Sequence, residues 1–150
     1  MKQITLICCF ITLIFSGCKK DESTTEQATD DDAKIQAYIK ANNIKATKDA
    51  SGLYYQIITP GTGNYPNSNS NVSVNYTGKL LDGTVFETSS LSYSPLSGLI
   101  QGWQIGIPHI NVGGRILLLV PSALGYGTAK QDNIPANSVL VFTIDLIGFK

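Results

Sequence analysis

The pattern of apolar and polar residues changes several times along the chain. An apolar run of twelve residues, Ile4 to Phe15, comes first, and a charged, hydroxyl-rich stretch follows from Lys19 to Asp32. The run is shorter than the ~20 residues that cross a bilayer, but it suits the core of a signal peptide. We therefore expect a signal peptide over residues 1–17. Because the polar stretch has little to bury, we expect a flexible linker over residues 18–32.

A short helical pattern follows the polar stretch. Ile35 and Ile39 recur at helical spacing behind an aspartate that suits a helix N-cap. The pair Asn42-Asn43 marks the end of the pattern. Residues 33–50 are therefore predicted to form a short helix and a lead-in, with the helix packed on the domain that comes next.

From residue 51 onward the pattern is that of β-strands. Val72, Val74 and Tyr76 alternate with polar residues, as in a strand with one buried face. The pair Asp82-Gly83 is a hairpin signal, and the interrupted apolar stretch at 99–110 favours a short helix against the sheet. Strand patterns occur in five places, at 53–59, from 72, from 85, at 115–120 and at 138–149. Five antiparallel strands around one short helix predict a single α+β domain over residues 51–150.

Composition and charge restrict the chemistry. The 150 residues hold 11 basic and 11 acidic side chains, so no excess of charge favours nucleic acid as a partner. All three cysteines precede the domain, which leaves it without a disulfide, a thiolate nucleophile or a cysteine zinc site. The only histidine, His109, has no motif of a catalytic or metal site beside it. We expect neither a metal nor a cofactor.

The residues that end at Cys18 read Leu-Ile-Phe-Ser-Gly-Cys. This stretch resembles a bacterial lipobox, whose cysteine receives a lipid and becomes the first mature residue. The resemblance implies lipidation of Cys18 and a place in the bacterial cell envelope. Lys19, rather than an aspartate, follows the cysteine, which favours the outer membrane. The alternative is an ordinary cleaved signal peptide.

Aromatic and aliphatic residues at the ends of strands and helices remain as candidates for a site. They stand in motifs that follow one another as VNYTGKL at 74–80, DGTVFETS at 82–89, LIQGW at 99–103, GGR at 113–115, VP at 120–121, LGYG at 124–127, IP at 134–135 and LVF at 140–142. This order resembles the FKBP-type peptidyl-prolyl isomerases from about residue 51 to the C-terminus. Any one motif would be a weak signal, whereas several in the same order are specific.

The resemblance implies a half-barrel, in which a five-stranded antiparallel sheet wraps around a short helix and a pocket lies between them. Trp103 would form the floor of the pocket. The Ile100 backbone N–H and the Tyr126 hydroxyl would donate hydrogen bonds to the substrate. The implied walls are Tyr76, Phe86 and Phe142, with Leu99 at the rim and Ile134 beside the loop of Tyr126.

Two positions and one segment depart from the family pattern. Glu87 stands where relatives commonly have an aspartate, and Leu124 stands where they usually have an aromatic residue. The segment between Phe86 and Ile100 is shorter than usual, and Tyr93 within it is a candidate for a displaced rim aromatic. We place Glu87 with the catalytic residues, and Leu124 and Tyr93 with the residues that bind substrate.

The implied function is peptidyl-prolyl cis-trans isomerisation that assists the folding of envelope proteins, without a covalent intermediate. The partners would be polypeptides that contain proline, and a lipid on Cys18 would attach the protein to the membrane. The alternative is a lipoprotein that binds prolyl or apolar peptides without catalysis. Relatives can carry long dimerising arms before this domain. The predicted helix of eleven residues is too short for such an arm, so a monomer is expected.

Overall fold

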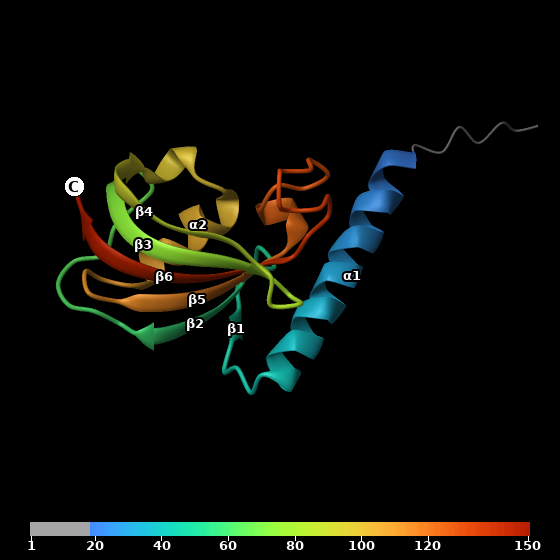
Figure 1. The fold of residues 1–150 in the computed structure, drawn as a ribbon, viewed down its shortest axis with the longest axis horizontal. Helices are drawn as coiled ribbons and strands as arrows, with labels where there is room; N and C mark the ends of the chain where they lie inside the picture. The colour runs from blue at the N-terminus through green and yellow to red at the C-terminus, as the bar shows by residue number, and fades with distance from the viewer. Residues whose placement is uncertain (1–18) are drawn as a thin grey trace, which may run out of the picture.

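The computed structural model describes residues 19–150, with side chains from residue 24 onward. Its centre is one antiparallel sheet with the strand order β1-β2-β5-β6-β3-β4. The sheet curves around α2, and α1 crosses one end of it (Figure 1). The helices and strands are α1 (Lys19–Ala41), β1 (Thr47–Lys48), β2 (Tyr54–Thr59), β3 (Asn71–Leu80), β4 (Val85–Pro95), α2 (Gln101–Gly106), β5 (Arg115–Val120) and β6 (Leu140–Phe149).

The five predicted strands are confirmed, and the two-residue strand β1 adds a sixth at the edge of the sheet. The turn between β3 and β4 falls at the predicted hairpin. The Leu80 N–H donates to the Thr84 carbonyl at 2.9 Å, and the Gly83 N–H donates to the Leu80 carbonyl at 3.0 Å. Gly83 has a φ of +90°, which glycine adopts without strain. The prediction of an α+β domain with an antiparallel sheet therefore holds.

Two glycines let α2 lie directly on strand β5. A Cβ at Gly102 would come within 2.6 Å of the Val120 side chain, and one at Gly106 would come within 2.5 Å of Leu118. The predicted helix is confirmed in shorter form, as α2 followed by a 3₁₀ turn over Ile107–His109. This close approach places the residue after Gly102, which is a tryptophan, in the core between α2 and the sheet.

Helix α1 is longer than the sequence predicts. It has 23 residues, so the linker predicted over 18–32 is wrong from residue 19 onward, and the helix does not begin at residue 33. Its domain-facing stripe continues through Asp31 and Gln27, which lie one and two helical turns before Ile35. These two side chains make hydrogen bonds instead of apolar contacts. A reading of hydropathy alone therefore misses this half of the helix.

The second half of α1 packs on the domain, as predicted, and it does so on the outer face of the sheet. Ile35 is fully buried in a cluster with Leu119 and Val141. Beside it, the Asp32 carboxylate accepts hydrogen bonds from the Tyr54 hydroxyl at 2.8 Å and from the Lys48 ammonium at 2.5 Å. Apolar burial and this polar contact together hold α1 to the sheet.

Three predictions about the N-terminal part stay open. The signal peptide and Cys18 lie outside the described residues. Between residues 19 and 150, no helix combines the length and the apolar character needed to cross a membrane. The monomer prediction rested on a helix of eleven residues, and the 23-residue α1 removes that premise, so the oligomeric state stays a prediction.

Candidate functional site

A pocket opens on the side of the sheet that faces α2. Its volume is about 170 Å³, whereas sites for drug-sized ligands occupy roughly 300–1,000 Å³. It therefore suits one small apolar group. The lining residues are Tyr76, Glu87, Leu91, Leu99, Ile100, Trp103, Tyr126 and Phe142. All of them except Leu91 are among the residues predicted from the sequence.

The floor of the pocket is a set of interlocked rings around Trp103, which is only 4% exposed. Tyr76 crosses the indole at 4.8 Å and 81°, and Phe142 crosses it at 5.2 Å and 89°. Both are edge-to-face contacts, which aromatic pairs prefer to a flat sandwich. Phe86 packs behind Phe142, at 5.6 Å and 84°, and does not line the pocket. Among the side chains that the structure describes, from residue 24 onward, the Trp103 Nε1 is the only buried polar atom without a hydrogen-bond partner, so the indole is held by packing.

The start of α2 sets one rim of the pocket. The Ile100 carbonyl accepts hydrogen bonds from the backbone N–H groups of Trp103 at 2.9 Å and of Gln104 at 3.2 Å. The Gln104 side chain donates to the Leu99 carbonyl at 2.7 Å, which holds the segment before the helix. In the part of the chain that the structure describes, no group accepts a hydrogen bond from the Ile100 N–H. The rim therefore carries a free backbone donor.

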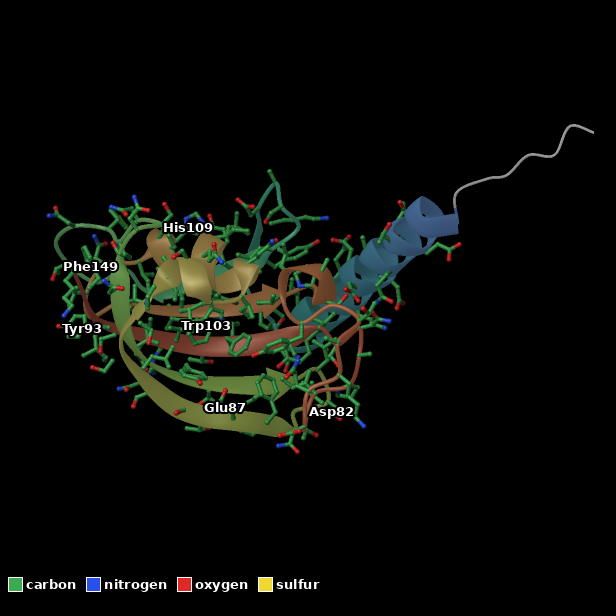
Figure 2. The ribbon with its side chains drawn as sticks, turned by 90° about the horizontal axis from the view of Figure 1, so that it is seen from above. Asp82, Glu87, Tyr93, Trp103, His109 and Phe149 are labelled. Carbon is green, nitrogen blue, oxygen red and sulfur yellow. The ribbon has the colours of Figure 1, made fainter. Side chains whose placement is uncertain are left out.

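Polar groups gather across from this rim. Burial raises the pKa of the Tyr126 hydroxyl, and the negative charge of Glu87 raises it further. Burial and, after it, the nearby Glu87 carboxylate raise the pKa of Tyr76 to about 12. Glu87 comes from β4 (Figure 2). Two tyrosines that keep their protons thus face a single carboxylate.

Glu87→Gln is expected to lower the pKa of Tyr76 below its value of about 12. The pKa should stay above 10, because burial, the largest cause of the shift, is unchanged. Since the folded-state pKa exceeds the unfolded one, the unfolded chain loses this proton first. The contribution of Tyr76 to the free energy of unfolding is therefore complete below pH 10 and is lost as the pH rises toward 12. In Glu87→Gln the loss ends at a lower pH, because the folded-state pKa is lower.

The measurement is a titration of the Tyr76 ring signals by NMR, together with urea unfolding across the alkaline range. Glu26→Gln removes the same charge from an exposed position on α1 and serves as the control. An unchanged Tyr76 titration in Glu87→Gln would show that Glu87 does not influence the Tyr76 pKa.

Tyr93 does not reach the pocket, so its predicted place at the rim is wrong. It lies at the end of the sheet near Phe149, away from Trp103 (Figure 2). The residue is 46% exposed, and its ring packs under the Lys150 ammonium, 4.4 Å from the ring centroid. Gly148 lies beside the same ring.

The cause is a bulge in β4. Val72 pairs with Ser94, but Val74 pairs with Leu91, so β4 carries one residue more than β3 between these points. Tyr93 sits in the bulge with a φ of +46° and is turned away. Leu91 lines the pocket instead. It is the only apolar residue between positions 87 and 92, and this isolation was the available signal.

Two other residues predicted to bind substrate lie behind the residues that line the pocket. Ile134 is 6% exposed and belongs to the main core, and the partly buried Leu124 packs against that core. Neither lines the pocket. They support the loop that carries Tyr126 and do not touch the cavity.

A larger, open depression lies on the opposite face of the sheet. Its volume is about 570 Å³, and hydroxyl, amide and charged side chains form most of its lining. Arg115 and Asp145 there satisfy each other through hydrogen bonds of 2.6 and 2.9 Å. Among the side chains described, from residue 24 onward, no three of His, Cys, Asp or Glu group so that they could hold a metal ion. The aromatic pocket is therefore the better candidate for the functional site.

Sequence comparison agrees with this geometry. The family model for FKBP-type peptidyl-prolyl cis-trans isomerase matches residues 63–147. The chain is 38% identical over 133 residues to the FKBP-type peptidyl-prolyl cis-trans isomerase FkpA of Escherichia coli (strain K12), which covers 83% of this chain and 48% of the relative. It is 35% identical over 141 residues to a probable FKBP-type isomerase of Haemophilus influenzae, covering 90% and 58%. The chain thus spans about half the length of the curated relatives it matches.

Solved structures show the same fold. The crystal structure of FkpA from Escherichia coli has a TM-score of 0.72 at 35% identity, over 86% of this chain and 63% of that one. A crystal structure of a peptidyl-prolyl cis-trans isomerase from Pseudomonas syringae has a TM-score of 0.69 at 29% identity, over 85% and 96%. The predicted half-barrel is therefore confirmed.

Proposed function

Because this chain belongs to the FKBP-type peptidyl-prolyl cis-trans isomerase family, we propose that its pocket binds the proline of a polypeptide and accelerates isomerisation of the preceding peptide bond. The observation that carries the proposal is the buried floor of Trp103, crossed edge-on by Tyr76 and Phe142. A proline ring is small and apolar, which matches the volume and the lining of the pocket.

This reaction breaks no bond, so the site needs no nucleophile. The uncatalysed bond isomerises in ~10–100 s across a barrier of ~18–20 kcal/mol. A turnover of about 10 s⁻¹ corresponds to a barrier near ~16 kcal/mol, so the site has to lower the barrier by roughly 2–4 kcal/mol. A few hydrogen bonds, each worth about 0.5–1.5 kcal/mol, and the effect of an apolar environment are sufficient.

The pocket acts on the difference between the planar and the twisted amide. Charge-separated resonance stabilises the planar form, and water favours that form, so an apolar pocket weakens it relative to the twisted one. The Ile100 N–H and the Tyr126 hydroxyl donate to substrate carbonyls in this proposal. A donor that fits only the twisted amide lowers the barrier further. Burial and the charge of Glu87 keep the Tyr76 hydroxyl protonated at the wall.

The proposed role is to assist the folding of proline-containing proteins. The test is the refolding of a protein whose slow phase is limited by prolyl isomerisation. That phase should speed up in the presence of the full chain, and a Leu-Pro peptide should compete. The alternative of binding without catalysis predicts a change in the emission of Trp103, the only tryptophan, at an unchanged refolding rate. Unchanged emission together with an unchanged rate would contradict both.

We also propose that a lipid on Cys18 holds the chain in the bacterial cell envelope, at the outer membrane. The support is the apolar run followed by Ser16-Gly17-Cys18. Cys18→Ser is expected to abolish the incorporation of labelled fatty acid in bacterial cells and to move the protein out of the membrane fraction. Cys8→Ser, within the apolar run, is the matched control and should change neither. Labelling that persists in Cys18→Ser would contradict the anchor.

A further inference from the structure

A carboxylate on α1 is buried against the loop that carries Tyr126. Asp31 is 1% exposed, and its Oδ2 accepts hydrogen bonds from the Ser122 backbone N–H at 2.8 Å and from the Ser122 hydroxyl at 2.6 Å. Its Oδ1 accepts a hydrogen bond from the Gln27 side chain at 2.7 Å. Burying a carboxylate is costly unless it is hydrogen-bonded, and this one has three donors. Asp31 therefore joins α1 to the domain through a buried, hydrogen-bonded contact.

Ser122 in turn holds the turn around Tyr126. It begins the 3₁₀ turn Ser122–Leu124 and is 2% exposed. Its carbonyl accepts hydrogen bonds from the N–H groups of Gly125 at 3.0 Å and of Gly127 at 2.8 Å. These two residues flank Tyr126. Asp31 is therefore linked, through Ser122, to the N–H groups of the residues on both sides of the tyrosine.

Two further backbone hydrogen bonds connect the rest of the loop to this turn. The Tyr126 carbonyl accepts a hydrogen bond from the Ala129 N–H at 3.1 Å, and the Gly127 carbonyl accepts one from the Asn137 N–H at 2.8 Å. The loop lies between α1 and the rest of the domain (Figure 1). The side chain that anchors it lies before residue 63, where the family match begins.

From this arrangement we infer that Asp31 is a positioning residue for the isomerase site, which holds Ser122 so that the Tyr126 hydroxyl faces the pocket. The inference rests on the proposed function, because it assigns Tyr126 a part in the reaction. It makes α1 a component of the site and not only an arm that leads to the domain. Asp31 acts through Tyr126 and does not touch the substrate.

The test uses the full chain with Asp31→Ala. We expect kcat/KM for a prolyl peptide to fall about two- to tenfold, the factor that one or two hydrogen bonds are worth. Asp30→Ala is the matched control, because Asp30 is exposed and pairs with the exposed Lys34, at 2.6 Å. It should retain wild-type activity. Ser122→Ala removes one of the two donors and keeps the other, so it should lose less than Asp31→Ala and is the variant to use if Asp31→Ala does not fold.

Two measurements separate positioning from a general loss of stability. Amide hydrogen exchange at Gly125 and Gly127 should quicken in Asp31→Ala while core amides keep their protection. In a double-mutant cycle, Asp31→Ala should cost little more once Tyr126→Phe has removed the hydroxyl. The same fold-loss in both backgrounds, or unchanged exchange at the two glycines, would overturn the inference. If the wild type does not isomerise prolyl peptides, the proposed function fails, and the exchange comparison alone decides whether Asp31 holds the turn.

Discussion

Gly78→Ala is expected to lower kcat/KM for a prolyl peptide by more than tenfold and the free energy of unfolding by about 1–3 kcal/mol. A Cβ at this position on β3 would overlap the ring of Phe86 and lie 2.9 Å from Phe142 Cε1. The two rings meet edge-to-face at 5.6 Å, and Phe142 in turn contacts Trp103. A displacement at Gly78 therefore passes through Phe142 to the floor of the pocket.

The measurements for Gly78→Ala are urea unfolding and prolyl isomerisation on the same preparation. Gly98→Ala is the matched control, because its Cβ would meet no atom within 4 Å, although it lies in the turn just before the rim residue Leu99. The control should retain its stability and most of its activity. Equal activity in the two variants would show that close packing against Phe86 and Phe142 does not shape the pocket.

Trp103→Leu is the second large effect, with an expected loss in kcat/KM of at least tenfold. A tenfold loss equals about 1.4 kcal/mol, a large part of the roughly 2–4 kcal/mol that the site has to supply. Leucine leaves part of the floor empty and removes the ring surface that Tyr76 and Phe142 contact. Because the side chain is buried, the free energy of unfolding should fall as well, by about 1–3 kcal/mol.

Activity of Trp103→Leu is to be measured where circular dichroism shows the variant to be folded, so that stability and catalysis are separated. Tyr93→Leu is the control, since it also replaces an aromatic residue of the domain, but one that packs on Lys150 away from the pocket. It should retain wild-type kcat/KM. If Trp103→Leu loses no more activity than Tyr93→Leu, the floor has no special role. A large loss in both variants would place Tyr93 in the site after all.

The strands could be predicted because each buries one face and is bounded by clear turn signals. Tyr76 is an example, since its alternation with Asn75 and Thr77 places it on the inner face, where the structure has it. The pocket floor could be predicted from the order of the motifs, because Trp103 and Phe142 lie in motifs that follow one another as in a known family. Local pattern and family order agree at these positions, so both lead to the same contacts.

The failures have physical causes of two kinds. The first half of α1 was missed because Gln27 and Asp31 take positions on the packing stripe that apolar residues normally occupy. Asp31 also bonds Ser122, which lies far from it in the sequence. Tyr93 was predicted to line the pocket where Leu91 does, because one extra residue in β4 breaks the alternation of faces. Neither a long-range hydrogen bond nor a bulge leaves a periodic trace in the sequence.

The most direct test of the central claim is exchange NMR on a Leu-Pro or Phe-Pro peptide with a catalytic amount of the full chain. The uncatalysed cis and trans forms interconvert in ~10–100 s. The account predicts exchange peaks between the two forms that grow in proportion to protein concentration, and that Trp103→Leu sharply reduces. Interconversion rates that are equal with and without the wild-type protein would contradict the claim that this pocket is an isomerase site.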